Sequence, residues 1–529
     1  MERRLEMFKG KTNSSQRIEK INADSINSPC IPFGNSLNER LDWLRKQLDR
    51  CSDAVFHQFS VTQIKYCAVV YLKGMVNQEL FQEHVLDPIM SMDFAVSEAD
   101  FIFKILDTKH LSVLSYSIVT DLQEALNNIL EGQIVLFLDC ENRMIAFPFT
   151  KFEKRSVSEP KNEVLIRGPR ESFVEDININ VTMIRRRIKS SSLKIEEMKF
   201  GTYTQTTVLL AYIEGVCKQE LVKEVKKRVS QIEIDGVLDS NYIEEFIQDN
   251  PLSPFPQLQT TERPDTLSAS LLEGRIAILV DGSPIAVLAP VSFYMLVQSA
   301  EDYYQNFYAA TWIRWIRYIF IVVSLLMPSF YIAVTTFHPG MIPTNLLLSM
   351  AAAREPVPFP ALVEAFIMEI TFEALREASI RIPTVVGQSV SILGALVIGQ
   401  AAVQVGLVSA PMVIIVSITG IASFIIPNFN LGLTLRLLRF PIMIMAGTLG
   451  LFGLMICVIL IFLHLVTLRS FGTPYLAPIA PLEVTDLKDV AVRAPWWLMR
   501  KRPVLFGTSG SERSKIPRRY QSKEEDDGD

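Results

Sequence analysis

The longest apolar run of the chain covers residues 440–468 and reads FPIMIMAGTLGLFGLMICVILIFLHLVTL. It contains no Asp, Glu, Lys or Arg, and His464 stands near its end. An α-helix rises about 1.5 Å per residue and the hydrocarbon core of a bilayer is about 30 Å thick, so this run is long enough to cross a membrane. We therefore predict a transmembrane helix here, with His464 at the interface.

A second apolar run, residues 316–337, is preceded by aromatic and basic side chains. Tryptophan sits at headgroup level, and basic residues next to a span favour its cytoplasmic end. We predict a span over 316–337 that begins on the cytoplasmic side. Its expected interface anchors are Trp312, Arg314, Trp315 and Arg317.

Two further spans are predicted over 385–407 and 411–427. In the first, small residues recur every four positions, a pattern that lets another helix approach closely. These expected packing residues are Ser391, Ala395 and Gly399. Three glutamines in the same segment either form hydrogen bonds between helices or line a pore; they are Gln388, Gln400 and Gln404.

Between the apolar runs lies FIMEITFEALREASIRIP, residues 366–383. We predict an amphipathic acidic helix over about 360–378. On a helix, Glu369, Glu373 and Glu377 lie within an arc of about 100°. Charges at membrane depth are costly and face protein or water. The helix therefore lies at the interface, or it faces water in an oligomer, where a ring of these three glutamates would form a cation path.

The tail over 469–529 contains APWWLMRKRP. We expect its aromatic and basic residues to anchor it to anionic headgroups: Trp496, Trp497, Arg500, Lys501 and Arg502. If the chain has four spans, the basic residues of the tail lie in the cytoplasm and Arg436 and Arg439 lie outside. If it has five spans, the tail lies outside and Arg436 and Arg439 lie in the cytoplasm. We favour a cytoplasmic tail.

An internal repeat organises the part that precedes the spans. YLKGMVNQEL at 71–80 aligns with YIEGVCKQEL at 212–221, and LEGQIVLFLD at 130–139 aligns with LEGRIAILVD at 272–281. Each pair shares five of ten residues, at offsets of 141 and 142. Two matches at nearly one offset indicate a duplicated α/β subdomain, each copy running strand, helices and a final hairpin.

The predicted fold class is an α/β soluble region of two duplicated subdomains followed by an all-α polytopic membrane domain. A hydrophobic content of 49% with 21% charged residues agrees with this mixture. The expected parts are a disordered arm over 1–35, subdomain 1 over 36–150, a linker helix region over 151–192, subdomain 2 over 193–300, the membrane domain over 312–468 and the tail.

Several classes of protein are disfavoured. The first twenty residues are polar and lack an apolar signal-peptide core, so we expect the soluble region to remain in the cytoplasm. The net charge of −5 gives no reason to expect nucleic acid. The six cysteines form no CxxC, the five histidines are dispersed, and nucleotide, zinc and nucleophile-elbow motifs are missing. We expect no enzyme activity, cofactor or metal.

The block from PVPFPALVEAF through SITGIASFIIP, residues 356–427, resembles the A-subunit family of spore germinant receptors, the GerA family of endospore-forming bacteria. RGPRESFVEDI at 167–177 and PYLAPIAPL at 474–482 also look like family segments. The resemblance covers about residues 40–505.

The resemblance implies a nutrient receptor subunit in the spore inner membrane, with a transporter-like B subunit and a lipoprotein C subunit as partners. It also implies that A subunits form a homo-oligomeric ring that releases monovalent cations early in germination. The alternatives are a family paralogue that assists release of spore-core solutes, a solute transporter, and a membrane-anchored signalling scaffold.

Overall fold

The computed structural model describes residues 36–61, 66–91, 116–139, 141–150, 159–160, 162–381, 399–503 and 513. These residues divide into two compact units. The first holds one sheet with its helices, and the second holds another sheet together with the apolar helices. The predicted arm over 1–35 and the end of the tail beyond 503, apart from Arg513, lie outside the described residues.

The first sheet has five strands in the order β1-β2-β4-β5-β3, and the pairs β2–β4, β4–β5 and β5–β3 are antiparallel. Its strands are β1 Ala54–Ser60, β2 Tyr66–Leu72, β3 Ser117–Val119, β4 Ile134–Leu138 and β5 Met144–Phe147. The helices of this copy are α2 Leu37–Gln47, α3 Gln78–Phe81, the π-helix η3 Gln82–Leu86, α4 Asp87–Ser91 and α6 Leu122–Leu130.

The second sheet repeats this plan in the order β6-β7-β9-β10-β8, again antiparallel. Its strands are β6 Leu193–Phe200, β7 Thr206–Ile213, β8 Gln259–Thr261, β9 Ile276–Val280 and β10 Ala286–Ala289. Its helices are α7 Ile177–Arg187, α8 Gln219–Ser230, α9 Ser240–Ile247 and α10 Pro264–Leu272.

The identical strand order confirms the predicted duplication. In both copies a helix precedes the first strand, a helix follows the second, and another helix precedes the closing hairpin. One boundary differs from the expected one. α7 lies in the predicted linker region 151–192, yet its apolar residues Ile177, Val181 and Ile184 belong to the core of the second sheet. The second copy therefore begins with this helix, which Asp176 caps by accepting from the amide of Asn178.

Both faces of the second sheet are buried. Val208, Leu210 and Tyr212 of β7 pack against α8 and α9, while Leu209 and Ala211 pack in a second cluster with α7 and α10. Because successive strand side chains point to opposite faces, a strand covered on both sides must be apolar throughout. This explains the continuous apolar stretches of β9 and β10, which form the closing hairpin of this sheet.

Equivalent turn glycines of the two repeats provide the first prediction. Gly74 and Gly215 both have positive φ, +85° and +81°. A Cβ at Gly74 would stand 2.7 Å from Oγ1 of Thr182, whereas a Cβ at Gly215 meets nothing within 4 Å. We expect Gly215→Ala to cost about 1–2 kcal/mol of unfolding free energy, from the backbone alone. Gly74→Ala should cost about 1 kcal/mol more, through the clash.

Thermal unfolding of the full-length protein in detergent tests this difference. Gly215→Ala is the matched control, because it shares the backbone conformation without the contact. Equal losses in the two variants would contradict the close approach of Thr182.

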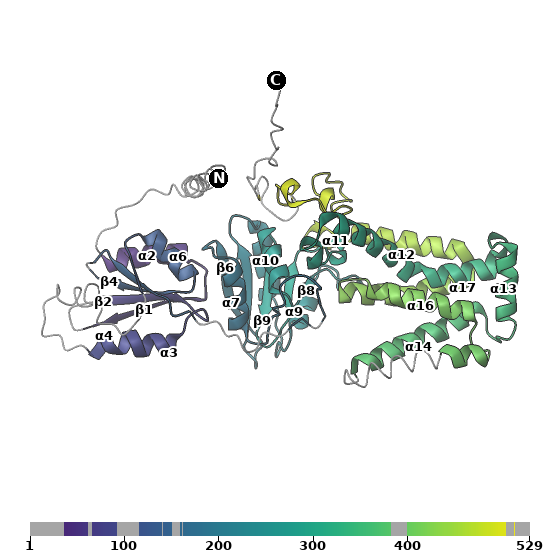
Figure 1. The fold of residues 1–529 in the computed structure, drawn as a ribbon, viewed down its shortest axis with the longest axis horizontal. Helices are drawn as coiled ribbons and strands as arrows, with labels where there is room; N and C mark the ends of the chain where they lie inside the picture. The colour runs from purple at the N-terminus through teal and green to yellow at the C-terminus, as the bar shows by residue number, and fades with distance from the viewer. Residues whose placement is uncertain are drawn as a thin grey trace, which may run out of the picture. The chain divides into compact units, whose positions relative to one another are not determined.

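The helices after the second sheet form the membrane part. They are α11 Phe293–Val297, the 3-10 helix η4 Ala300–Tyr303, α12 Phe307–Phe337, the 3-10 helix η5 Pro339–Met341, α13 Thr344–Arg354, α14 Ala361–Arg381, α16 Ala410–Phe424 and α17 Phe429–Thr467. Within the described part of the chain, α12 and α17 are long and apolar enough to cross a membrane, and α16 is shorter but apolar. α12, α16 and α17 lie side by side, with α14 beside α16 (Figure 1).

The tail returns to this part of the chain. It contributes β11 Arg469–Ser470, β12 Thr473–Pro474 and the 3-10 helices η6 Leu487–Asp489 and η7 Trp496–Leu498. Tyr475 is fully buried and donates from its hydroxyl to the carbonyl of Pro256, while Thr434 of α17 donates to the carbonyl of Pro254. The segment before β8 is thus fixed to both the tail and α17.

Candidate functional site: charged pairs among the membrane helices

In α14, the predicted acidic helix, apolar side chains are exposed and a charged side chain is buried, which is the reverse of a helix on a soluble protein. Its apolar residues Val363, Ile367 and Ile370 are exposed, whereas Glu369 is only 3% exposed. A helix in lipid turns its apolar side outward and its charges toward protein or water. The pattern agrees with a position at membrane depth.

Glu369 is held by an arginine of α17. Its Oε2 accepts from Nη1 of Arg439, and the Nε of Arg439 donates to the carbonyl of Ser324 on α12 at 2.9 Å. Arg439 Nη2 also donates to Ser324 Oγ at 3.2 Å. Both charged side chains are 4% exposed. This buried pair therefore connects α14, α17 and α12.

One turn along, Glu373 forms a second pair with α17. Its Oε1 lies 3.0 Å from Nη1 of Arg436, and its Oε2 lies 3.5 Å from Nη1 of Arg376. Arg376 donates to Ser423 Oγ on α16 at 2.6 Å, and its guanidinium lies 4.5 Å from the ring centre of Phe424. Arg376 thus connects α14 to α16 while Glu373 connects it to α17.

The other two glutamates of α14 differ from these. Glu377 pairs with Arg381 one turn later, and both side chains are exposed, at 59% and 78%. Glu364 is fully buried and accepts from the amide of Ser409 at 2.5 Å and from its hydroxyl, just before α16. Within one chain, Glu377 is the most exposed glutamate of the predicted acidic face, and Glu373 is exposed in part.

The partners of the acidic face were not predicted from the sequence. Arg436 and Arg439 were considered there only as charges that bear on topology. Their spacing of three residues places them on one side of a helix, as does the spacing of four between Glu369 and Glu373. Two such matched pairs in apolar surroundings are a signal that could have predicted the contact.

The remaining predicted pore and packing residues have mixed outcomes. Gln388, Ser391 and Ala395 lie outside the described residues. Residues 399–404 are helical, and Gln400 and Gln404 are exposed. A Cβ added at Gly399 would meet nothing within 4 Å in the described part of the chain, so the expected close packing at Gly399 is not found there. A close helix contact at this position stays a prediction for another chain only.

The expected interface anchors on α12 divide into two kinds. Trp312 and Trp315 are exposed, at 63% and 48%. Arg314 and Arg317 are buried, at 1% and 7%, so the prediction that they contact lipid headgroups is wrong within this structure. The physical reason is that both guanidinium groups share the carboxylate of Asp302, with Oδ2 at 3.0 Å from Arg314 and 2.7 Å from Arg317, and Arg314 has Asp489 as a second carboxylate partner.

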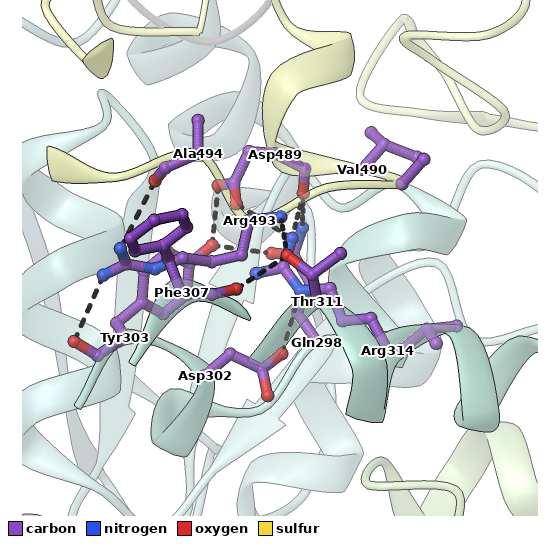
Figure 2. A network of polar contacts seen from close by, with 12 residues as sticks. Gln298, Asp302, Tyr303, Phe307, Thr311, Arg314, Asp489, Val490, Arg493 and Ala494 are labelled. Carbon is purple, nitrogen blue, oxygen red and sulfur yellow. Dashed lines mark hydrogen bonds and ion pairs between the residues drawn. The ribbon is translucent and has the colours of Figure 1, made fainter. Parts of the chain in front are cut away.

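Arg314 also contacts the C-terminal tail, through Asp489. Its Nη1 lies 2.9 Å from Oδ1 of Asp489, whose Oδ2 accepts from the hydroxyl of Tyr303 at 2.6 Å (Figure 2). Gln298 donates to the carbonyl of Asp489 at 2.5 Å, and the indole of Trp315 donates to the carbonyl of Ala491 at 2.8 Å. We call Asp302, Tyr303, Arg314, Arg317 and Asp489 the juxtamembrane clamp.

Burial shapes the electrostatics of the clamp. It raises the pKa of Asp489 above its ordinary value, although the positive charge of Arg314 opposes this shift. Burial likewise raises the pKa of Tyr303 far above its usual range, so this hydroxyl remains a hydrogen-bond donor. The clamp therefore fixes the tail near the beginning of α12, with Arg314 as its ion-pair partner and Tyr303 as a hydrogen-bond donor.

Of the tail residues expected at the interface, Trp496, Trp497, Arg500 and Lys501 are exposed. Arg502 is half-buried and donates from Nε to the carbonyl of Leu272 at 2.8 Å. Lipid contact by the exposed residues stays a prediction. Among the described residues, no group of three or more His, Cys, Asp or Glu could hold a metal ion.

A duplicated α/β region joined to long apolar helices with buried ion pairs is the architecture of a membrane protein. The chain belongs to the GerA family: a sequence model of "Bacillus/Clostridium GerA spore germination protein" matches residues 42–505. Membership makes it a spore germination protein rather than an enzyme, and it confirms the resemblance seen in residues 356–427.

Several proteins of known sequence are similar over most of their length. The chain is 47% identical to "Uncharacterized membrane protein YfkQ" of Bacillus subtilis (strain 168), covering 91% of this chain and 93% of that protein. It is 43% identical to "Spore germination protein KA" of the same organism, covering 88% and 86%. It is 38% identical to "Spore germination protein GerLA" of Bacillus cereus, covering 91% and 98%.

One solved structure is also similar, with 32% sequence identity and a TM-score of 0.39. It is the crystal structure of the N-terminal domain of the A subunit of the Bacillus megaterium spore germinant receptor GerK3, and the match covers 50% of this chain and 98% of that domain.

Proposed function

We propose that this protein is the A-type subunit of a nutrient germinant receptor in the spore inner membrane. It assembles with a transporter-like B subunit and a lipoprotein C subunit, and its soluble region faces the cytoplasm. Copies of the chain form a ring through which monovalent cations leave the spore core when nutrient binds. The support for the receptor assignment is family membership over residues 42–505.

The observation that supports a cation path is α14. It places several glutamates on a helix at membrane depth, where ionisable residues are rare and functional by default. Within one chain, Glu369 and Glu373 are paired with arginines of α17, and Glu377 stays exposed. In a symmetric ring, Glu377 would add one accessible negative charge per subunit, which attracts cations.

Glu377→Gln tests this path, because its exposed pair with Arg381 is worth only about 0.3–0.5 kcal/mol and the fold should be kept. We expect early potassium release after nutrient addition to slow by about twofold or more, since the local cation concentration falls. Glu373→Gln should act in the same direction. The measurement is potassium efflux from spores with matched receptor levels.

Glu355→Gln is the matched control, since Glu355 is an exposed glutamate at the end of α13, outside α14. Release triggered without any nutrient receptor should be unchanged in all variants. If Glu377→Gln, Glu373→Gln and their combination release potassium at the normal rate, α14 does not line the path and its charges serve helix packing alone.

The same spores separate the main alternative, a paralogue that assists release of core solutes. One observation favours this alternative: a relative with 47% sequence identity is named only as a membrane protein. A receptor subunit is needed for the response to particular nutrients. A paralogue would instead change release whatever the trigger, so deletion spores tested with nutrient and non-nutrient triggers distinguish the two.

A further inference from the structure

A pocket of about 520 Å³ lies where the second sheet meets the start of α17. α9, strand β8 and the segment Pro427–Asn430 form its walls. It is separate from the ion pairs of α14 and from the juxtamembrane clamp. Its size falls within the range of sites for small organic ligands, about 300–1,000 Å³.

The lining of this pocket has one sign of charge. It includes the carboxylates of Glu163, Asp239, Glu244 and Glu262, together with amide and hydroxyl side chains, and no basic side chain among the described residues. Low-dielectric walls with acids of one sign concentrate cations. The composition therefore selects for a positively charged ligand.

Glu244 is the central observation. Its side chain is 5% exposed and lines the pocket, yet within the part of the chain that the structure describes it makes no hydrogen bond or ion pair. Burial of an unpaired carboxylate is unfavourable unless it is protonated or meets a cation. Ile243 and Ile247 on the same helix are fully buried in the sheet core, so Glu244 is held in position by rigid packing.

The other acids of the pocket already have partners. Asp239 accepts from the hydroxyl of Ser283. Glu163 accepts through Oε2 from Thr261 Oγ1 at 2.6 Å and from the amide of Glu262 at 3.2 Å. They add negative potential, while Glu244 provides an unpartnered carboxylate.

Arg263 does not line the pocket, although it lies beside Glu163. Its guanidinium donates to the backbone carbonyls of Glu163 and Pro169 and to the carboxylate of Asp265. These three acceptors engage the Arg263 side chain. Glu244 is left without a cationic neighbour among the described residues.

We infer that this pocket binds a small organic cation with a protonated amine, and that the amine pairs with Glu244. A bare divalent ion fits less well, because no three acidic side chains of the described residues converge as metal ligands. An amine needs one or two acceptors and fills the remaining volume with its carbon skeleton. Bound there, it connects α9 to Asn428, whose side chain caps α17.

The test is ligand binding by the purified full-length protein in detergent at pH 8. The probe is 1,4-diaminobutane, with 1,4-butanediol as its neutral counterpart and potassium chloride at matched ionic strength. We expect the diamine to raise Tm by about 2–4 °C at saturation and the other two to leave it unchanged. Calorimetry then gives the Kd.

Glu244→Gln should weaken diamine binding by about tenfold or more, because it removes the charged acceptor. Glu245→Gln is the matched control: Glu245 is the next residue on α9, exposed, and hydrogen-bonded to Asn241. It should bind the diamine like the unaltered protein. Asn241→Lys is a second variant at an exposed lining position, and its own ammonium should compete with the ligand.

A pH series adds an independent readout. Burial, and then the charges of Glu245 and Asp239, raise the pKa of Glu244 to about 7 from 4.5. The folded chain holds this proton more tightly, so Glu244 lowers stability as pH rises from about 4.5 to about 7, and the loss persists above pH 7. Without ligand, Glu244→Gln should therefore gain Tm relative to the unaltered protein between pH 5.5 and pH 8.

Two results would overturn the inference. One is full diamine binding by both Glu244→Gln and Asn241→Lys. The other is an equal Tm shift with potassium chloride alone, which would mean that the pocket responds only to ionic strength. Neither result bears on potassium release through the proposed path.

Discussion

Arg439→Met is expected to lower the unfolding free energy by about 3–5 kcal/mol. It leaves the Glu369 carboxylate, which is 4% exposed as a side chain, without its partner among apolar helices. It also removes the two hydrogen bonds that Arg439 donates to Ser324. The measurement is the fraction of full-length protein that stays monodisperse in detergent after heating.

Arg436→Met is the matched control for this prediction. Its partner Glu373 is 43% exposed and keeps its second ion pair with Arg376, so the loss should be clearly smaller. Arg439→Met combined with Glu369→Leu should recover most of the stability, because two well-packed apolar residues can replace a buried pair at little cost. Simple additivity of the two single losses would show that the pair is not coupled.

Arg314→Met is expected to cost about 3 kcal/mol and to release the tail from α12. The change removes the bond to Asp489 and one of the two guanidinium partners of Asp302. Arg317 still pairs with Asp302, so the loss stays at the lower end for a buried ion pair. Limited proteolysis of a C-terminally tagged chain should then cleave the segment around Asp489 several-fold faster.

Trp315→Phe is the control for the clamp, since it removes only the hydrogen bond to the carbonyl of Ala491 at an exposed position. It should cost about 1 kcal/mol and leave the tail protected. Asp489→Asn should resemble Arg314→Met in the proteolysis assay. Unchanged cleavage in both variants would mean that other tail contacts, such as Tyr475 with Pro256, suffice to hold it.

Local patterns made some of this architecture predictable. The matches at 71–80 with 212–221 and at 130–139 with 272–281 predicted two copies of one fold, and the sheets have the same strand order. Two strands of each copy were missed. The first strands, β1 and β6, were not predicted, and the short strands β3 and β8 have three residues, which carry too little periodicity to recognise. The role of α7 was missed because its last turn contains three consecutive arginines, a pattern typical of an exposed helix.

The candidate site was only half predictable. The helix with Glu369, Glu373 and Glu377 follows from spacing alone, and α14 covers it. The pairing of Glu369 with Arg439 joins residues 70 positions apart, and that of Arg314 with Asp489 joins residues 175 apart. No local periodicity encodes such contacts.

The sequence by itself determined the duplication, the apolar spans, the acidic helix and the family, because each depends on the order of residues along a short stretch. Tertiary structure alone decided which charges are neutralised, that Arg314 and Arg317 turn inward, and that Glu244 faces a pocket without a partner. Whether a charge is buried or paired depends on which helices pack together. Helix packing is the combined result of many side-chain contacts distant in the chain, so it becomes visible only in the folded molecule.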